Sequence, residues 1–252
     1  MSRGKKRYER GKLLCGRIRR EAFDGEVRTM AGFDRKIRNV LRDKRSQLSE
    51  VTGNILSAAK GDDIDSVYIT SAHPGEGKTT MAIGMAYGME VTVKRRVAVI
   101  EANISSPSFE RVFDISAESA GLYDYLIGDA GIDDITHRME RGDPIVIAGG
   151  TKSARNVWLD TYEENRYAGK LRELTDQFTY SVFDGDSVMA ATGSTIAVQQ
   201  FDGTVLTVEC GATKWQVASL AKEKLLGYGA NVLGVALNRR EYPIPNAIYS
   251  RV

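Results

Sequence analysis

The stretch SVYITSAHPGEGKTT, residues 66–80, decides the fold of this chain. Residues 67–69 form a short apolar run of β-forming side chains, which predicts a buried strand. Turn-forming residues follow at 72–77, and Lys78 opens an apolar segment that is typical of a helix. A strand, a glycine-rich loop and a helix beginning at Gly-Lys-Thr together predict a phosphate-binding loop, or P-loop. The usual pattern has a glycine six residues before the lysine, where this chain has Ala72.

The P-loop predicts a nucleotide-binding site whose residues have distinct roles. Backbone N–H groups and the positive end of the helix attract phosphate oxygens. Lys78 is expected to reach the outer phosphates, and the Thr79 hydroxyl is expected to bind Mg²⁺. The loop residues predicted to bind the nucleotide are Pro74, Gly75, Glu76, Gly77, Lys78, Thr79 and Thr80.

Strand-like and helical patterns alternate along the rest of the chain. Further strands are predicted at 97–100, 145–148, 180–184, 205–208 and 232–237, and helices at 121–128, 163–176 and 215–226. This alternation predicts an α/β fold of the P-loop NTPase type, with a doubly wound, mostly parallel sheet and helices on both faces. Such sheets bind ligands at the carboxyl ends of their strands. There the P-loop is expected to meet Glu101, Asp184 and Asn238.

The charge distribution suggests how the chain is divided. Residues 1–50 carry 16 Lys or Arg and 7 Asp or Glu, although the whole chain has a net charge of only +2. We predict a basic mobile arm (1–33), an N-terminal helix (34–61) and a P-loop domain with an extended C-terminal tail (62–252). A basic arm on an acidic body indicates an anionic membrane surface, nucleic acid or an acidic protein patch as partner, or else a solvated tail.

The cysteines and the hydropathy pattern bear on location. Cys15 and Cys210 are far apart, which argues against a disulfide framework or a metal site and favours a reducing compartment. The N-terminus lacks the apolar stretch of a signal peptide, and no apolar run approaches the ~20 residues of a membrane helix. The sequence predicts a cytoplasmic protein, with any membrane contact peripheral, at the inner face of the plasma membrane.

Four segments in combination resemble the cytoplasmic bacterial tyrosine kinases of capsule and exopolysaccharide synthesis, which are relatives of the MinD/ParA ATPases. They are PGEGKT at 74–79, the stretch 97–108, the stretch 121–128, and GANVLGVALNR at 229–239, and the resemblance covers about residues 45–252. It implies ATP and Mg²⁺ as cofactors, protein-tyrosine kinase activity and a membrane polysaccharide co-polymerase or export protein as partner.

The resemblance also implies residue roles. Lys78, Glu101 and Asp184 match catalytic positions of the family, and Thr79 and Asp184 match its metal-binding positions. Asn238 matches a residue beside the adenine, and Arg239 follows it in the same nucleotide-binding segment. The family usually has Asp-x-Asp after the second strand, where this chain has Glu101 and Asn103. We hypothesise that Asp186, which lies beyond Asp184 where the family usually has proline, replaces the missing carboxylate as a metal ligand.

Two features of the kinases are absent from this sequence. The Glu-x-x-Arg-x-x-Arg pattern of ring assembly would place arginines at Gly53 and Leu56 after Glu50, so self-association lacks its usual motif. The tail has only Tyr242 and Tyr249 where the kinases carry a tyrosine cluster. Two alternatives to a kinase therefore stay open. One is a nucleotide-dependent switch docking on the export machinery; the other is a MinD/ParA-type positioning ATPase, which has lysine at the position of His73.

Overall fold

The computed structural model describes residues 39, 41, 43–58, 64–93, 96–139, 143–161, 167–190 and 197–239. The predicted basic arm and the two tail tyrosines lie outside the described residues, and the predicted domain boundaries stay predictions. The strands are β1 (Ser66–Ser71), β2 (Val97–Glu101), β3 (Ile145–Ile147), β4 (Tyr180–Ser187), β5 (Gly203–Glu209) and β6 (Val232–Asn238). The helices are α2 (Arg45–Ala58), α3 (Lys78–Val93), α4 (Phe109–Phe113), α5 (Leu122–Ile127), α6 (Ile132–Ile135), α7 (Lys152–Thr161), α8 (Ala168–Thr175), the 3₁₀ helix η1 (Ala197–Gln200) and α10 (Trp215–Gly227).

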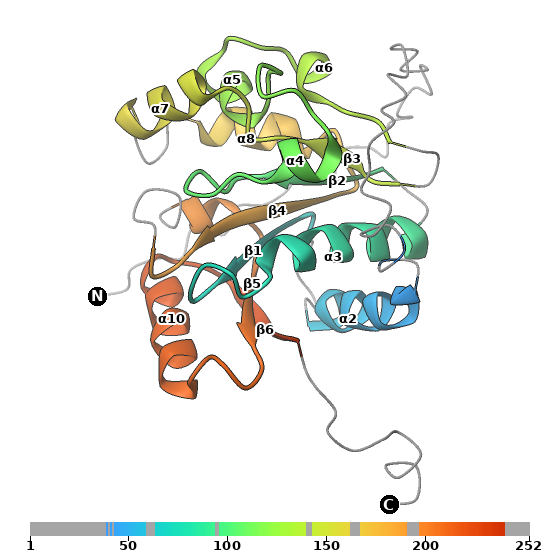
Figure 1. Cartoon of the computed structure of the whole chain (residues 1–252), viewed down its shortest axis with the longest axis vertical. Coiled ribbons are helices and arrows are strands. Elements are labelled where there is room, and N and C mark those ends of the chain that lie inside the picture. Colours follow the sequence, from blue (N-terminus) through green and yellow to red (C-terminus); the bar gives the residue numbers. More distant parts are fainter. Residues whose placement is uncertain are drawn as a thin grey trace, which may run out of the picture.

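The six strands form one parallel sheet in the order β3-β2-β4-β1-β5-β6 (Figure 1). Strand β1 lies between β4 and β5, so the P-loop that follows it stands in the middle of the sheet. All carboxyl ends meet at one edge, where Glu101 of β2 is in register with Asp184 of β4. The predicted fold class, with a doubly wound parallel sheet, is confirmed.

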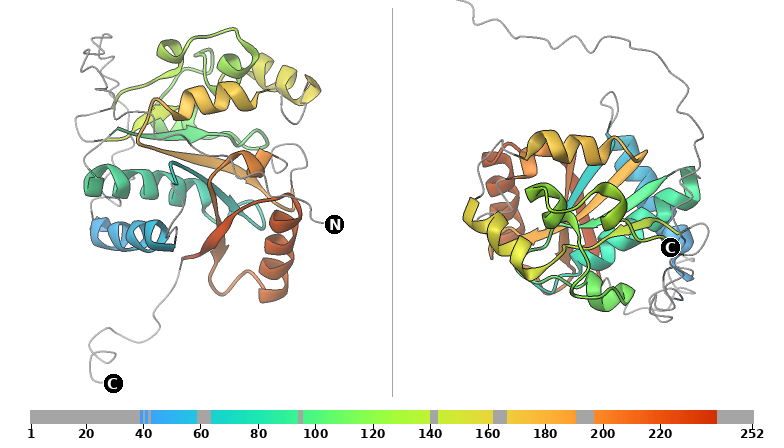
Figure 2. Two further views of the ribbon diagram at one scale, coloured as in Figure 1. Left: turned by 180° about the vertical axis from the view of Figure 1, so that it is seen from behind. Right: turned by 90° about the horizontal axis from the view of Figure 1, so that it is seen from above.

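Helices cover both faces of the sheet (Figures 1 and 2) and enclose two apolar cores. One core joins the strand residues Phe183 and Leu206 to α5, α7, α8 and α10. The other joins Ile69 and Val99 to α3 and α4. Residues of β1 and β2 are buried throughout, as expected for strands covered on both sides. The sheet is therefore a rigid base for the loops at its carboxyl edge.

Helix α2 packs against α3 through two glycines. A Cβ atom on Gly84 would lie 2.8 Å from the Leu48 side chain, and one on Gly88 would lie 2.7 Å from the Thr52 hydroxyl. Side chains at these positions would force the helices apart, so glycine permits their close approach. The helix predicted at 34–61 is thus observed from Arg45 to Ala58, and much of its predicted first half lies outside the described residues.

Several helices were not predicted from the sequence. Helices α4 and α6 have 5 and 4 residues, too few for a periodic pattern to be recognised. Helix α7 is longer, and its apolar residues at 154, 157 and 158 do follow helical spacing. The helix predicted at 163–176 is observed as α8, although 162–166 are outside the described residues. Among the described helices, none has the length and apolar character needed to cross a membrane.

Candidate nucleotide-binding site

The P-loop joins β1 to α3 and depends on two glycines in the left-handed region. Gly75 and Gly77 have φ angles of 89° and 92°, which other residues rarely adopt. A Cβ atom on Gly77 would also lie 1.9 Å from the amide nitrogen of Asn238. At the position of the missing glycine, Ala72 is fully buried. Its N–H donates to the Glu76 carboxylate over 2.8 Å, and its φ angle is not positive, so this position does not require glycine.

The backbone N–H groups of residues 75–80 are open to a ligand. Within the described part of the chain none of them donates a hydrogen bond, and the first helical bond of α3 runs from the Met81 N–H to the Gly77 carbonyl. The loop therefore presents unused donors at the positive end of a 16-residue helix. This arrangement attracts an anion with several oxygens, such as a polyphosphate. Pro74, Gly75 and Thr80 are exposed around it.

Lys78 and Thr79 stand at the start of α3. Lys78 is only 7% exposed, and no acidic side chain among the described residues forms an ion pair with it. Its positive charge nevertheless lowers the pKa of the Asp184 carboxyl. The Thr79 hydroxyl donates to Asp184 Oδ2 over 2.7 Å. The predicted phosphate-binding residue Lys78 thus lies next to the predicted metal-binding pair of Thr79 and Asp184.

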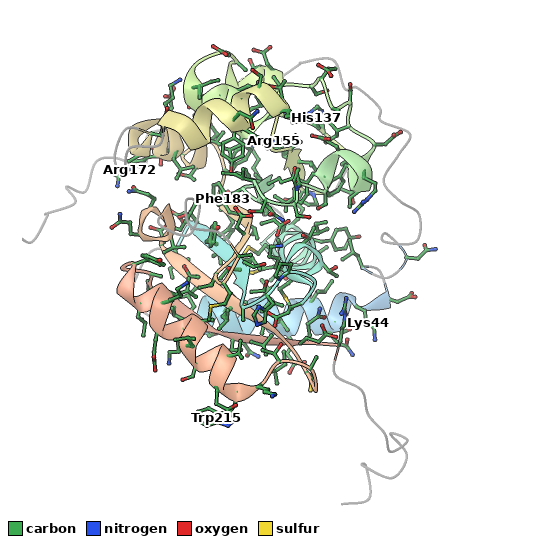
Figure 3. All side chains as sticks on the ribbon, turned by 60° about the vertical axis from the view of Figure 1, so that its left-hand side comes forward. Lys44, His137, Arg155, Arg172, Phe183 and Trp215 are labelled. Atoms are coloured by element: carbon green, nitrogen blue, oxygen red, sulfur yellow. The ribbon has the colours of Figure 1, made fainter. Side chains whose placement is uncertain are left out.

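Asp184 is a buried carboxylate with unused binding capacity. It follows Phe183, which lies inside the molecule (Figure 3), and it is fully buried itself. Burial raises the pKa of Asp184 to about 7; the Thr79 hydrogen bond and Lys78 oppose this rise, while the charges of Glu101 and Asp186 add to it. Its Oδ1 has no hydrogen-bond partner within the described residues. A buried oxygen without a partner fits a ligand position for a cation.

The residues around Asp184 fit Mg²⁺ in part. Asp184 and Thr79 supply adjacent oxygens, the ligand type that Mg²⁺ requires. Within the described part of the chain, no three His, Cys, Asp or Glu side chains converge as a metal-binding group. An ion here would complete its shell with phosphate oxygens and water, as Mg²⁺ ordinarily does.

Glu101 is committed to backbone hydrogen bonds. One carboxylate oxygen accepts the N–H groups of Ser108 and Phe109 at the start of α4, and the other accepts the N–H of Gly149 over 3.0 Å. Burial raises the pKa of Glu101, and these hydrogen bonds oppose the rise. The side chain thus fastens the loops after β2 and β3 to each other. Its predicted catalytic role stays a prediction, and its observed contacts are structural.

Asn103 and Asp186 organise the loop after β2. The Asn103 side chain bonds to the backbone of Ser106 at both its oxygen and its nitrogen. The Asp186 carboxylate accepts the N–H of Ile104 over 3.2 Å and that of Ser105 over 3.0 Å. Asp186 is therefore next to the position where the family has its second carboxylate, but it binds backbone there. Its predicted role as a metal ligand stays a prediction.

A β-bulge in β4 separates Asp184 from Asp186. Strand β1 advances from Ile69 to Ser71 while β4 advances from Asp184 to Ser187, so β4 contains an extra residue. A bulge interrupts the alternation of side chains along a strand. Asp184 can therefore point to Thr79 while Asp186 points to the loop after β2. No pattern in the sequence indicated this bulge.

The ends of β5 and β6 meet the P-loop from the other side. The Asn238 side chain donates to the Glu76 carbonyl over 2.9 Å, so its nitrogen contacts the P-loop backbone. Arg239 forms a 2.9 Å ion pair with Glu209 and is largely exposed. The expected contacts of Asn238 and Arg239 with a nucleotide stay predictions.

The hydrogen bond between Glu76 and Thr213 was not predicted from the sequence. Glu76 was predicted as one of the nucleotide-binding loop residues, with no contact to a distant segment expected. It is only 4% exposed, and its carboxylate accepts a hydrogen bond from the Thr213 hydroxyl. Thr213 lies just before α10 and is distant from every motif. Only the position of Glu76 between two glycines was visible in the sequence.

Comparisons with known proteins place these observations in context. No protein-family model matches the chain. The tyrosine-protein kinase CpsD of Streptococcus pneumoniae serotype 4 is 24% identical over 187 residues, which cover 73% of this chain and 80% of that protein. The tyrosine-protein kinase YwqD of Bacillus subtilis is 25% identical over 201 residues, covering 77% and 81%.

Solved structures agree with this result at the level of the fold. The kinase domain of VpsO has a TM-score of 0.69 at 23% identity, covering 81% of this chain and 98% of that one. The septum site-determining protein MinD of Pyrococcus horikoshii, solved with Mg-ADP, has a TM-score of 0.57 at 16% identity, covering 74% and 76%. The resemblance to bacterial tyrosine kinases and their MinD-type neighbours is confirmed.

Proposed function

From its relationship to the bacterial tyrosine kinases, we propose that this chain is an ATP- and Mg²⁺-dependent phosphotransferase of the tyrosine kinase type that regulates exopolysaccharide or capsule synthesis. One observation carries the proposal. The unused N–H groups of residues 75–80 lie beside buried Lys78 and the Thr79–Asp184 pair, an arrangement suited to a metal-bound polyphosphate.

The residues of the site have separable tasks in this reaction. The P-loop N–H groups would hold the phosphates, and Lys78 would offset the negative charge that develops on the transferred phosphoryl group. Thr79 and Asp184 would hold Mg²⁺, which would supply positive charge to offset the negative charge of the phosphates. Asp184 must be deprotonated to do so. Lys78 favours that state, because a nearby positive charge lowers the pKa of a carboxyl group.

A second function, a nucleotide-dependent switch without phosphoryl transfer, is favoured by a specific observation. A kinase needs a group that orients or deprotonates the attacking hydroxyl. Both oxygens of Glu101 and both polar atoms of the Asn103 side chain are bonded to backbone groups. Of the positions Glu101, Asn103 and Asp184, only Asp184 has a carboxylate oxygen without a partner in the described residues. A group free to activate the attacking hydroxyl is thus lacking at the other two positions, which favours the switch.

We propose a membrane polysaccharide co-polymerase or export protein as the partner of this chain, with the chain acting at the inner face of the membrane. The proposal rests on the tyrosine kinase relatives and on the resemblance to the capsule and exopolysaccharide family. Co-purification of this chain from membranes with a polysaccharide co-polymerase or export protein would test it.

The proposed reaction is tested by intact-mass measurement after incubation with ATP and Mg²⁺, with ADP release followed in parallel. Lys78→Met is the inactive control, and Lys152→Met, an exposed lysine of α7, is the matched control. Phosphate that appears on a tyrosine, and is lost in Lys78→Met alone, supports the kinase. ADP release without protein phosphate supports the switch. Absence of nucleotide binding contradicts both.

A further inference from the structure

The Glu76 carboxylate is buried inside the P-loop without a positively charged partner within hydrogen-bonding distance among the described residues. One of its oxygens accepts the N–H groups of Ala72 and His73, over 2.8 and 3.1 Å. The other accepts the Thr213 hydroxyl over 2.5 Å. A negative charge next to a phosphate site opposes phosphate binding by repulsion. The benefit of Glu76 must therefore come from the hydrogen bonds that it accepts.

These hydrogen bonds tie the P-loop to the segment that starts α10. Thr213 stands two residues before Trp215, the first residue of α10. The Asn238 side chain, at the end of β6, holds the Glu76 carbonyl from another direction. Thr213, which follows β5, thus holds the side chain of Glu76, and Asn238, which ends β6, holds its main chain. Between the flexible Gly75 and Gly77, Glu76 is the residue through which the loop is held.

We propose that Glu76 is a positioning residue that fastens the P-loop to the start of α10 through Thr213, and so keeps the N–H groups of residues 75–80 directed at the phosphates. This inference rests on the proposed nucleotide-binding function and specifies how that site is held in shape.

The physical consequence is a change in nucleotide affinity. A loop with two left-handed glycines and unused donors has many accessible conformations when it is unattached. The observed dissociation constant rises as the fraction of molecules with the correct loop shape falls. A hydrogen bond to a charged group stabilises its arrangement enough for its loss to weaken binding on the order of tenfold.

The test measures binding of Mg-ADP by calorimetry to the full chain and four variants. Thr213→Val removes only the hydroxyl, Glu76→Ala removes all the carboxylate bonds, and Glu76→Gln removes only the charge. The glutamine oxygen can accept the Ala72 and His73 N–H groups while its nitrogen donates to the Thr213 hydroxyl, which can also act as an acceptor. Thr175→Val on α8, whose hydroxyl binds the Arg172 carbonyl, is the matched control.

The expected result is a roughly tenfold loss of affinity in Thr213→Val, at least that loss in Glu76→Ala, and recovery in Glu76→Gln. Affinity equal to wild type in Thr213→Val overturns the inference, as does a loss in Glu76→Gln that matches Glu76→Ala. If Glu76→Ala does not fold, Thr213→Val decides alone. If the wild-type chain does not bind Mg-ADP, both the proposed function and the inference are overturned. If the wild type binds and the affinities of Thr213→Val and Glu76→Ala equal its own, only the inference is overturned.

Discussion

Replacing Asp184 by asparagine is expected to stabilise the metal-free protein at high pH. Burial raises the pKa of Asp184 from 3.8 to about 7, so the folded protein binds this proton more tightly than the unfolded chain does. The free energy of unfolding therefore falls as pH rises from about 4 to about 7, and then levels off. Asparagine can still accept the Thr79 hydrogen bond and carries no charge to desolvate.

The magnitude follows from the size of the rise in pKa. A difference of roughly three pKa units corresponds to about 4 kcal/mol between the two protonation states. Between pH 5 and pH 8, the stability advantage of Asp184→Asn over wild type should grow by about 3 kcal/mol. That is a large share of the ~5–15 kcal/mol by which a folded domain is usually stable.

The assay is urea unfolding in EDTA at pH 5, 6, 7 and 8, with the variant compared with wild type at each pH so that other titrating groups cancel. Asp129→Asn is the matched control, because Asp129 is exposed. Addition of Mg-ADP should then stabilise wild type more than Asp184→Asn. A gap that stays constant with pH, or that shrinks towards pH 8, would refute the argument that an unpaired buried charge weakens the free protein.

Two further predictions concern packing and buried hydrogen bonds. Glu101→Gln should lower the free energy of unfolding by about 1–3 kcal/mol, because glutamine has one oxygen and would turn an N–H donor towards a buried backbone N–H such as that of Gly149; urea unfolding tests this, and an unchanged midpoint would contradict it. Gly88→Ala should destabilise by about 1–3 kcal/mol through contact with Thr52, whereas Gly53→Ala, which meets nothing within 4 Å, should stabilise by up to ~1 kcal/mol. Equal thermal shifts for both alanines would contradict the packing described for α2.

The sheet and the P-loop were predictable because both depend on local patterns. Apolar runs of strand length alternated with helical segments, and a Gly-Lys-Thr sequence stood between a strand and a helix. Each predicted strand was found, with its ends extended by a residue or more in most cases, as at β4, which continues past Asp184 to Ser187. Strand ends are set by pairing with neighbouring strands, and that pairing is not visible in a single segment.

The contacts of the site were predictable only where both residues belong to a recognisable motif. Thr79 and Asp184 were placed together because strand order in this fold brings the P-loop beside the end of β4. The bond between Glu76 and Thr213 joins residues 137 positions apart, and Thr213 belongs to no motif. The structural role of Glu101 was likewise hidden, because it depends on where the backbone of Gly149 passes. Long-range hydrogen bonds to backbone groups, or to side chains outside any motif, leave no pattern in one sequence.

Helix α3 connects the P-loop to the surface on which α2 packs. Its first turn carries Lys78, and its glycines further along hold α2. At 1.5 Å per residue a helix of 16 residues is roughly 24 Å long, so a tilt of about 5° at the P-loop moves its far end by about 2 Å. Because α2 packs closely against α3 at Gly84 and Gly88, it would move with α3. A tilt of α3 at the P-loop would therefore be passed on to α2.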